Sequence, residues 1–355
     1  MRGFAAPETK AAFVRAREIA RTIPDVPERF SAEYGLWSGM FLSGDLLAMR
    51  ELADAFLRSV EIRPDLPETG IAHRIAGMTC WFAGDFIAAR LHLERAYAHY
   101  DAERDRPLAF HFGQDLAVPA VAYLGLTLWP LGIGSPSGHL DQAITHAVRT
   151  EHVPTLAYAY LHAAFFQMMR RDHVRSASPL RAYLDLAREH GMPMWLAFGS
   201  FHEGWLLWHA GDHDEGTAQM RRGLGLICKE GIATFAPFCG VLLAETQAAA
   251  GRYDAAFATV DAELARMTGT GQCWYLAETH RVHGEIMLNS HAVDTTAAEA
   301  AFARAIEAAR SQSARRFEFR AAKSLARLLE HQGRSTEPRG LLAILGNGFD
   351  DSSDN

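Results

Sequence analysis

Apolar residues recur along most of this sequence at the three- and four-residue spacing that places them on one face of a helix. Ile75, Met78 and Phe82 form one such series. No segment shows a sustained alternation of apolar and polar residues bounded by hairpin turns, which is the pattern of a half-buried strand. The pattern therefore predicts an all-α chain.

A short polar turn, in most copies a glycine followed by a polar residue, interrupts the helical pattern at regular intervals. These turns fall at Gly44, Gly84, Gly132, Arg171-Asp172, Gly211, Gly251, Asn289–Asp294 and Gly333. The intervals from 44 to 84 and from 211 to 251 are both 40 residues. The spacing predicts about eight helix–turn–helix units, with a longer loop where Gly134–Gly138 is inserted after Gly132.

A small residue stands seven positions before several of these turns. These small residues are Gly77, Gly125, Gly204 and Ala244, with Gly284 in the unit that lacks a clean turn. A missing or minimal side chain lets two antiparallel helices approach closely, and a glycine at the turn accepts a left-handed backbone. We expect one right-handed superhelical solenoid over residues 1–345, in which each unit contacts mainly its neighbours, and a frayed acidic tail over 346–355.

The repeat resembles the tetratricopeptide repeat (TPR), with the usual unit of about 34 residues lengthened to about 40. Phe112–Asp115, Ala122–Trp129 and Phe302–Ala309 are also similar to the C-terminal region of bacterial class III adenylate or guanylate cyclases and transcriptional regulators that carry an AAA/STAND-type ATPase domain. This resemblance implies a sensor or regulator of the ATPase and output domains. The sequence itself contains no G-x-x-x-x-G-K-[ST] phosphate loop, so we expect neither cyclase nor ATPase activity from it.

Composition and charge narrow the class of partner. Hydrophobic residues make up 49% of the 355 residues and charged residues 22%, which suits a folded chain and excludes general disorder. The formal net charge of −7 argues against a nucleic-acid partner.

Leu116–Ile133 is long and apolar enough for a membrane span. However, Pro119 and Pro130 interrupt it and no arginine cluster flanks it, so no membrane partner is expected.

The cysteines and the first residues predict a cytoplasmic location. Cys80, Cys228, Cys239 and Cys273 are far apart and form no C-x-x-C pair, which fits a reducing compartment. Met1–Lys10 lacks the basic, apolar and small-residue order of a secretory signal.

No set of residues has the spacing of an active site or a metal site. His280 and His283 would share one helix face, but a third ligand is missing and no H-E-x-x-H motif is present. Ser200 lies in a predicted helix without the strand that a nucleophile elbow needs. We therefore expect a non-enzyme with no cofactor and no bound metal.

The repeat register predicts which side chains of each first helix face the concave side. The candidate partner-binding groove consists of Tyr34, Arg74, Trp81, Phe165, Phe201, Trp205, Trp208, His209, Glu245, Glu278, Arg281, Glu285, Arg320 and Lys323. This groove would be aromatic in its middle and charged towards its C-terminal end, and aromatic residues with arginine carry much of the binding energy in interfaces. The alternative is that some of the tryptophans belong to the core between repeats.

A run of basic residues on the last predicted helix has two interpretations. Arg316, Arg320, Lys323 and Arg327 recur at four- and three-residue spacings and would share a face. The face is expected to be solvated and balanced by Glu318 and Glu330, with contact to phosphate as the alternative.

These features favour a non-catalytic interaction and regulatory module in bacterial signalling. The expected partner is a protein or peptide held in the concave groove, such as a signalling partner that contains a cyclase or ATPase. The alternative is a small-molecule sensor whose ligand is enclosed by an aromatic pocket at Trp205 and Trp208.

Overall fold

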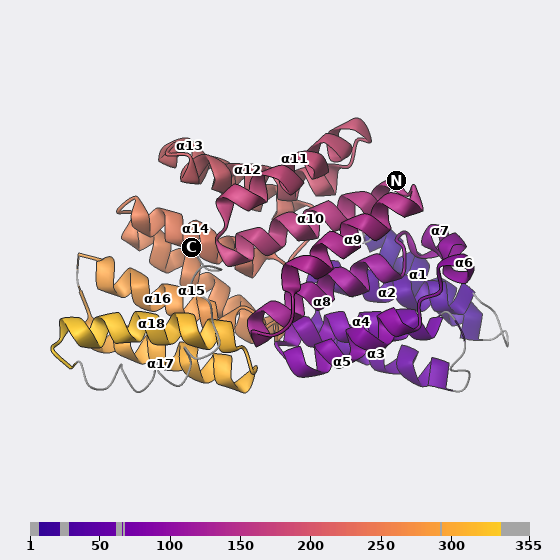
Figure 1. Cartoon of the computed structure of the whole chain (residues 1–355), viewed down its shortest axis with the longest axis horizontal. Helices are drawn as coiled ribbons and strands as arrows, with labels where there is room; N and C mark the ends of the chain where they lie inside the picture. The colour runs from indigo at the N-terminus through magenta and orange to yellow at the C-terminus, as the bar shows by residue number, and fades with distance from the viewer. Residues whose placement is uncertain (1–6, 22–27, 62–65, 67, 292, 335–355) are drawn as a thin grey trace.

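The computed structural model describes residues 7–21, 28–61, 66, 68–291 and 293–334, and within these residues it contains helices and no strand (Figure 1). The predicted all-α fold is therefore confirmed. The predicted tail, 346–355, lies outside the described residues. The longer helices are α1 (Pro7–Arg21), α2 (Glu28–Ser43), α3 (Leu46–Glu61), α4 (Glu68–Ala83), α5 (Phe86–Ala98), α8 (Ala117–Leu131), α9 (Pro136–Thr150), α10 (Val153–Arg170), α11 (His173–Glu189), α12 (Pro193–His209), α13 (His213–Lys229), α14 (Ala236–Ala249), α15 (Tyr253–Thr270), α16 (Leu276–Asn289), α17 (Thr295–Ser311) and α18 (Arg315–His331).

The predicted turns from Gly44 to Asn289–Asp294 each separate two helices, and the turn at Gly333 follows α18 at the end of the described residues. At Gly84 the backbone is left-handed, with φ of 81°, and the amides of Gly84 and Asp85 donate to the carbonyl oxygens of Trp81 (3.0 Å) and Cys80 (2.9 Å). These bonds satisfy carbonyl groups that the end of α4 would otherwise leave unpaired. The Asp85 carboxylate then accepts from the amide of Ala88 and begins α5.

The small residues before the turns lie where paired helices touch. A Cβ on Gly204 of α12 would lie 2.6 Å from the backbone nitrogen of Met220, and one on Gly216 of α13 would lie 2.5 Å from that of Trp208. A Cβ on Gly77 would meet the side chain of Leu93 at 2.7 Å. The close approach of the helix pairs, which the sequence predicted, is therefore confirmed at these positions.

The extra residues of the longest unit lie only partly where the sequence placed them. Gly134–Gly138 lengthens the loop only in part. Residues 132–135 separate α8 from α9, and α9 already begins at Pro136, with proline in the first turn where its missing N–H does no harm. The rest of the additional length lies between α5 and α8. It forms α6 (Ala102–Asp105), the 3₁₀ turn η1 (Arg106–Leu108) and α7 (Ala109–Phe112).

The apolar segment Leu116–Ile133 forms α8, and every residue of α8 is buried. Helices α4, α5, α9, α10 and α18 pack around it. An all-round apolar composition follows from burial on every face. Among the described residues no helix combines the length and the hydropathy that crossing a bilayer requires.

Units that are far apart in the sequence touch one another. The amide of Ala233 donates to the carbonyl of Leu42 at 2.7 Å, and the side-chain amide of Gln272 donates to that of Gly44 at 2.8 Å. Helix α18, near the C-terminal end, lies against α8 (Figure 1). Each unit still contacts mainly its neighbours, as expected, but the array curves so tightly that some helix ends also meet across its concave side.

Candidate binding pocket

The aromatic residues predicted for the middle of the groove are buried. Trp81, Phe201 and Trp205 are exposed by 0%, 1% and 2% of their surfaces. The Trp81 ring lies 4.2 Å from that of Trp274, in the turn before α16, and meets Tyr123 edge-on at 5.4 Å. These three residues therefore do not form an open surface in this structure; they belong to the core, as the alternative interpretation held.

The remaining aromatic candidates differ in exposure. Phe165 is also buried, with its ring 5.0 Å from Phe235 and 4.8 Å from Phe238. Trp208 and His209, at the end of α12, are half-buried and pack edge-to-face at 5.0 Å. The concave side is thus filled by aromatic packing in the middle of the molecule.

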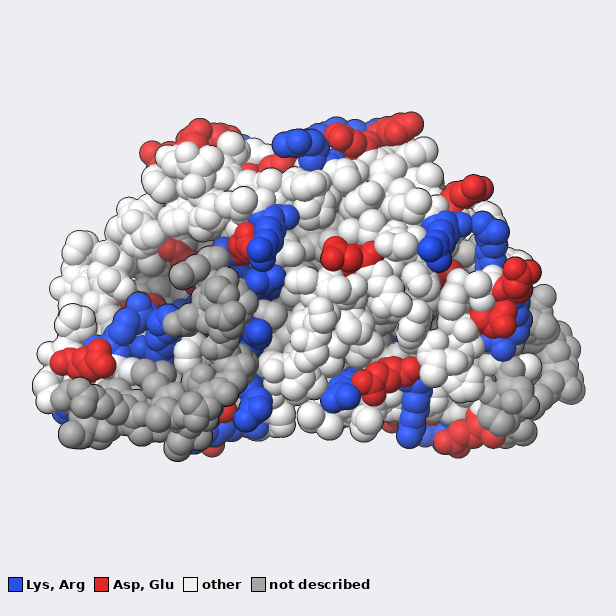
Figure 2. Space-filling model, viewed as in Figure 1, with Lys and Arg blue, Asp and Glu red and all other residues white. Residues whose placement is uncertain are grey.

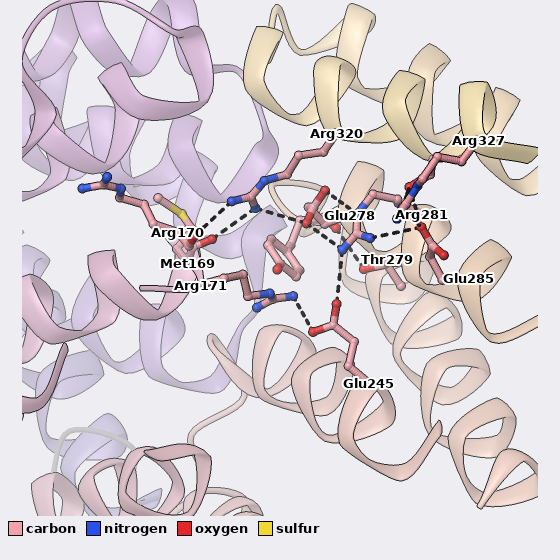
Figure 3. Close-up of polar contacts among 12 residues, drawn as sticks. Met169, Arg170, Arg171, Glu245, Glu278, Thr279, Arg281, Glu285, Arg320 and Arg327 are labelled. Atoms are coloured by element: carbon pink, nitrogen blue, oxygen red, sulfur yellow. Dashed lines mark hydrogen bonds and ion pairs between the residues drawn. The ribbon is translucent and has the colours of Figure 1, made fainter. Parts of the chain in front are cut away.

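Most of the charged candidates pair with one another inside the protein (Figure 3). Glu278 of α16 is fully buried and accepts from Nε of Arg281 at 3.0 Å and from Nη1 of Arg320 at 3.3 Å. Arg281 also reaches Glu245 of α14 at 3.2 Å, and Glu245 pairs with Arg171 at 2.6 Å. The network connects α10, α14, α16 and α18.

Glu285 extends this network towards the surface. Its Oε1 accepts from Arg327 at 2.7 Å and from the hydroxyl of Ser324 at 2.6 Å. Lys323, the remaining charged candidate, is exposed on α18. The charged half of the predicted groove is therefore largely occupied by contacts within the protein.

The ion pairs keep Glu278 charged. Burial by itself raises the pKa of this carboxyl, but Arg281 and Arg320 outweigh the effect and hold the pKa at about 2. The carboxylates of Glu278 and Glu245 raise the pKa of the Arg281 guanidinium, although burial alone would lower it. The ionised carboxylate of Glu278 therefore depends on the arginines of α16 and α18 that surround it.

The basic face of α18 is not simply solvated. The guanidinium of Arg320 lies 4.7 Å from the ring of Trp129 in α8, and that of Arg316 lies 5.7 Å from it. Arg320 also donates to the carbonyl oxygens of Met169 and Arg170. The expectation of a solvated face is therefore wrong at these two positions, because α18 packs on α8 through them.

A pocket of about 580 Å³ opens at the N-terminal part of the concave side, between α2, α4, α10 and the beginning of α12. Its wall is mainly aromatic: Tyr34, Trp37, Phe41, Tyr158, His162, Trp195, Phe198 and Phe235. Pockets of this volume and lining are typical of sites that hold small ligands or a few side chains.

Helical periodicity explains how α2 supplies one wall. Tyr34, Ser38 and Phe41 are separated by four and three residues and so share one face of the helix. Trp37 also reaches the pocket, and its indole N–H is satisfied because it donates to the hydroxyl of Thr79 at 3.0 Å. The indole of Trp37 therefore offers the pocket an aromatic surface and no free donor.

Helix α10 supplies the opposite wall with a neutral histidine. The ring of His162 stacks on that of Tyr158 at 3.9 Å, and its Nδ1 lies 2.9 Å from the Tyr158 carbonyl oxygen. Burial lowers the pKa of His162 to about 4. The imidazole is consequently uncharged near neutral pH and leaves this wall apolar.

Arg74 is the buried charged group of the pocket wall, and the exposed Glu230 is the other charged residue of the lining. It is 1% exposed, its Nη1 donates to the carbonyl oxygen of Asp115 at 3.2 Å, and its guanidinium lies 5.1 Å from the ring centre of Tyr34. Its Nε and Nη2 have no hydrogen-bond partner, and no carboxylate of a described residue lies within 4.0 Å. Buried charges are normally paired, so this cation is unusual.

Sequence reasoning found two residues of this pocket and missed most of the others. Tyr34 and Arg74 were predicted for the groove, whereas Trp37, Trp195 and Phe198 were not. Trp37 could have been found from its helical spacing to Tyr34. Trp195 and Phe198 enter the pocket only because the beginning of α12 lies opposite α2, and no local pattern encodes that contact.

Outside the pocket, the described side chains that could bind a metal or act as nucleophiles do not form a reactive site. No three His, Cys, Asp or Glu side chains in the described ranges are placed to hold a metal ion. The hydroxyl of Ser176 lies 2.5 Å from Nε2 of His202, but both are buried, and burial lowers the pKa of His202 to about 3. Burial also raises the pKa of the Cys239 thiol, which disfavours the reactive thiolate.

Comparison with other sequences gives one informative relative. The chain matches no family model. It is 27% identical over 335 residues to an uncharacterised protein of Rhizobium meliloti (strain 1021), in an alignment that covers 92% of this chain and 32% of the relative. The chain thus spans about a third of the length of the curated relative it matches.

Solved structures establish the fold. A Rap protein in complex with Competence and Sporulation Factor has a TM-score of 0.64 at 13% identity, over 98% of this chain and 93% of that one. The APC/C hetero-tetramer Cut9-Hcn1 gives 0.54 at 14% identity (90% and 52% covered), and the human IFIT1 dimer with m7Gppp-AAAA gives 0.51 at 12% (95% and 77%). At these identities the similarity shows the fold alone, a TPR-like solenoid.

Proposed function

We propose that this chain is a non-catalytic interaction module that binds a peptide segment of a partner protein in the pocket between α2, α4, α10 and α12. The observation that carries the proposal is the pocket itself, about 580 Å³ in volume with aromatic walls. It lies on the concave side at a place that the protein's own side chains leave open. A volume of this size accommodates two or three peptide side chains.

The chemistry of the surface favours a peptide over a nucleic acid. Acidic and basic side chains lie next to each other at many points of the face shown in Figure 2, and uncharged surface separates these groups. The net charge of −7 and an apolar pocket wall do not suit a polyphosphate backbone. The Rap structure with its bound factor supports the proposal only as an example of this fold with a ligand.

A small-molecule sensor is the second candidate, since the same pocket could enclose a drug-sized ligand. Its site would then be the wall of Tyr34, Tyr158 and Trp195, and not Trp205 and Trp208, because Trp205 is buried.

Whether the ligand is a peptide or a small molecule, we propose a regulatory role in bacterial signalling, in the cytoplasm. The resemblance to regions that follow cyclase and ATPase domains supports this role, as does a relative about three times as long as the match.

Selection of peptides from a random displayed library against the whole chain tests the proposed function. Selected peptides are titrated by fluorescence anisotropy against wild type, Ser38→Trp and Leu47→Trp. Ser38 lines the pocket, so a tryptophan there would fill it, whereas Leu47 is 70% exposed on α3 and serves as the matched control. Ser38→Trp should weaken binding at least tenfold, with Leu47→Trp unchanged; equal binding to both variants would refute the proposal.

A further inference from the structure

Arg74 differs from Arg281 and Arg320 in having no counter-ion among the described residues. Arg281 contacts the carboxylates of Glu278 and Glu245, and Arg320 contacts Glu278 and two carbonyl oxygens. Arg74 is more buried than either, yet its one hydrogen-bond acceptor is a neutral carbonyl group. A guanidinium in this environment attracts an anion strongly because little solvent screens its charge.

Asp115, the acidic residue that Arg74 contacts, does not supply that anion. Asp115 contacts Arg74 through its backbone carbonyl, while its carboxylate is engaged elsewhere. Oδ1 of Asp115 accepts from the amides of Ala117 and Val118 at the beginning of α8, and Oδ2 accepts from the hydroxyl of Tyr100 at 3.2 Å. The carboxylate is therefore committed to the N-terminus of α8 and leaves the charge of Arg74 uncompensated.

The two unpartnered nitrogens of Arg74 form one edge of the guanidinium. Nε and Nη2 present parallel N–H groups, and this edge matches the two oxygens of a carboxylate in a bidentate pair. Tyr34 packs over the guanidinium at 5.1 Å and restricts its orientation. A carboxylate that entered the pocket beneath the Tyr34 ring would satisfy both hydrogens and the charge together.

From this arrangement we infer that the pocket binds the C-terminal end of a peptide, with an apolar last residue whose carboxylate pairs with Arg74. The last residue of a chain carries its side chain and its carboxylate on one carbon atom, so an aromatic wall and a single cation can engage both. A phosphate group would bring two charges to one arginine, in a pocket whose other charged lining residue is the acidic Glu230. The inference rests on the proposed function, since it requires a peptide in this pocket.

Paired peptides that end in a free carboxylate or a carboxamide test the inference on the whole chain. Each selected peptide is titrated in both forms against wild type, Arg74→Met and, as a control, Arg95→Met, whose arginine is exposed on α5. Amidation should weaken binding to wild type and to Arg95→Met at least tenfold, because it removes the charge and one acceptor. With Arg74→Met the two forms should bind equally. Thermal unfolding checks that each variant is folded.

A second variant keeps the test decisive if Arg74→Met does not fold. Arg74→Lys retains the charge but lacks the planar edge, so it should bind the free acids at least threefold more weakly than wild type. The carboxylate inference would be overturned if wild type bound the free-acid and amidated peptides with equal affinity while Ser38→Trp still blocked both. That result would leave the proposed function standing. If N-acetylphenylalanine alone binds as tightly as the peptides, the site takes a small apolar acid and the assignment of a peptide end is wrong.

Discussion

Individual charged residues of the concave side serve two different purposes. Glu278 and Arg281 satisfy each other within the protein, whereas Arg74 keeps two N–H groups and its charge without a partner. The sequence placed all three in one groove, because repeat register predicts the direction of a side chain. Which residues lie opposite depends on the curvature of the array, and the register alone does not specify it.

Removal of one member of the buried ion network should destabilise the fold. Arg281→Met leaves the fully buried Glu278 without its closest cation, and the loss of one partner from a buried pair lowers the free energy of unfolding by about 3–5 kcal/mol. Arg222→Met is the control, because Arg222 and Glu215 are both more than half exposed and such pairs contribute about 0–1 kcal/mol. Urea unfolding measures both, and similar losses for the two variants would contradict the assignment of Glu278 to the core.

Buried histidines make stability fall in mild acid. His202 has a pKa of about 3 in the folded protein because burial disfavours its charged form, against about 6.5 in an unfolded chain. Protons therefore bind the unfolded chain first, and the stability due to His202 is present above pH 6.5 and is lost as the pH falls towards 3. His202→Gln should flatten the dependence of Tm on pH between 6.5 and 4. An unchanged slope would show that His202 does not titrate in this way.

Helices and turns are the scale at which the sequence was most informative. Gly84 ends one helix with a left-handed backbone, and Asp85 begins the next as its cap, so both boundaries can be predicted locally. Gly204 indicates a close approach of two helices. The prediction was only partly right at Gly134–Gly138, where α9 begins at Pro136, and it missed α6 and α7. Short helices that depend on tertiary packing leave little periodic signal.

The same substitution at two glycines should change stability in opposite directions. Gly204→Ala places a methyl group against the backbone of α13, and overpacking of this kind costs about 1–3 kcal/mol. Gly225→Ala puts that methyl group into open space on α13, where replacement of a helical glycine gains about 0.5–1 kcal/mol. Chemical denaturation of both variants checks the sign, and a stabilising Gly204→Ala would mean that α12 and α13 are not in close contact there.

The whole molecule is more closed than an open solenoid. Contacts such as Ala233 with Leu42 and Trp274 with Phe82 connect units that are far apart in the sequence, and the aromatic side chains between them fill the concave side. These contacts could not be predicted, since each repeat pattern reports only on its own pair of helices. The pocket at Arg74 is part of the concave side that this closure leaves open.

Closure should make the chain unfold as one unit. In an open repeat array each unit contacts only its neighbours, so terminal units can unfold separately. Here contacts such as Gln272 to Gly44 connect early and late units, and the calorimetric and van't Hoff enthalpies should therefore agree. Differential scanning calorimetry of the whole chain measures both. Two resolved transitions, or a calorimetric enthalpy well above the van't Hoff value, would contradict a closed array.

Amide hydrogen exchange of the whole chain, with and without a saturating selected peptide, tests most directly whether the N-terminal pocket is the binding site. Bound peptide should slow exchange in α2 around Tyr34, at the segment that precedes α8, and at the beginning of α12 around Trp195. The Ser38→Trp variant should show no such protection at the same peptide concentration. Slower exchange confined to α3 and α5, or to the end of α12 at Trp208, would contradict the assignment of the pocket as the site of recognition.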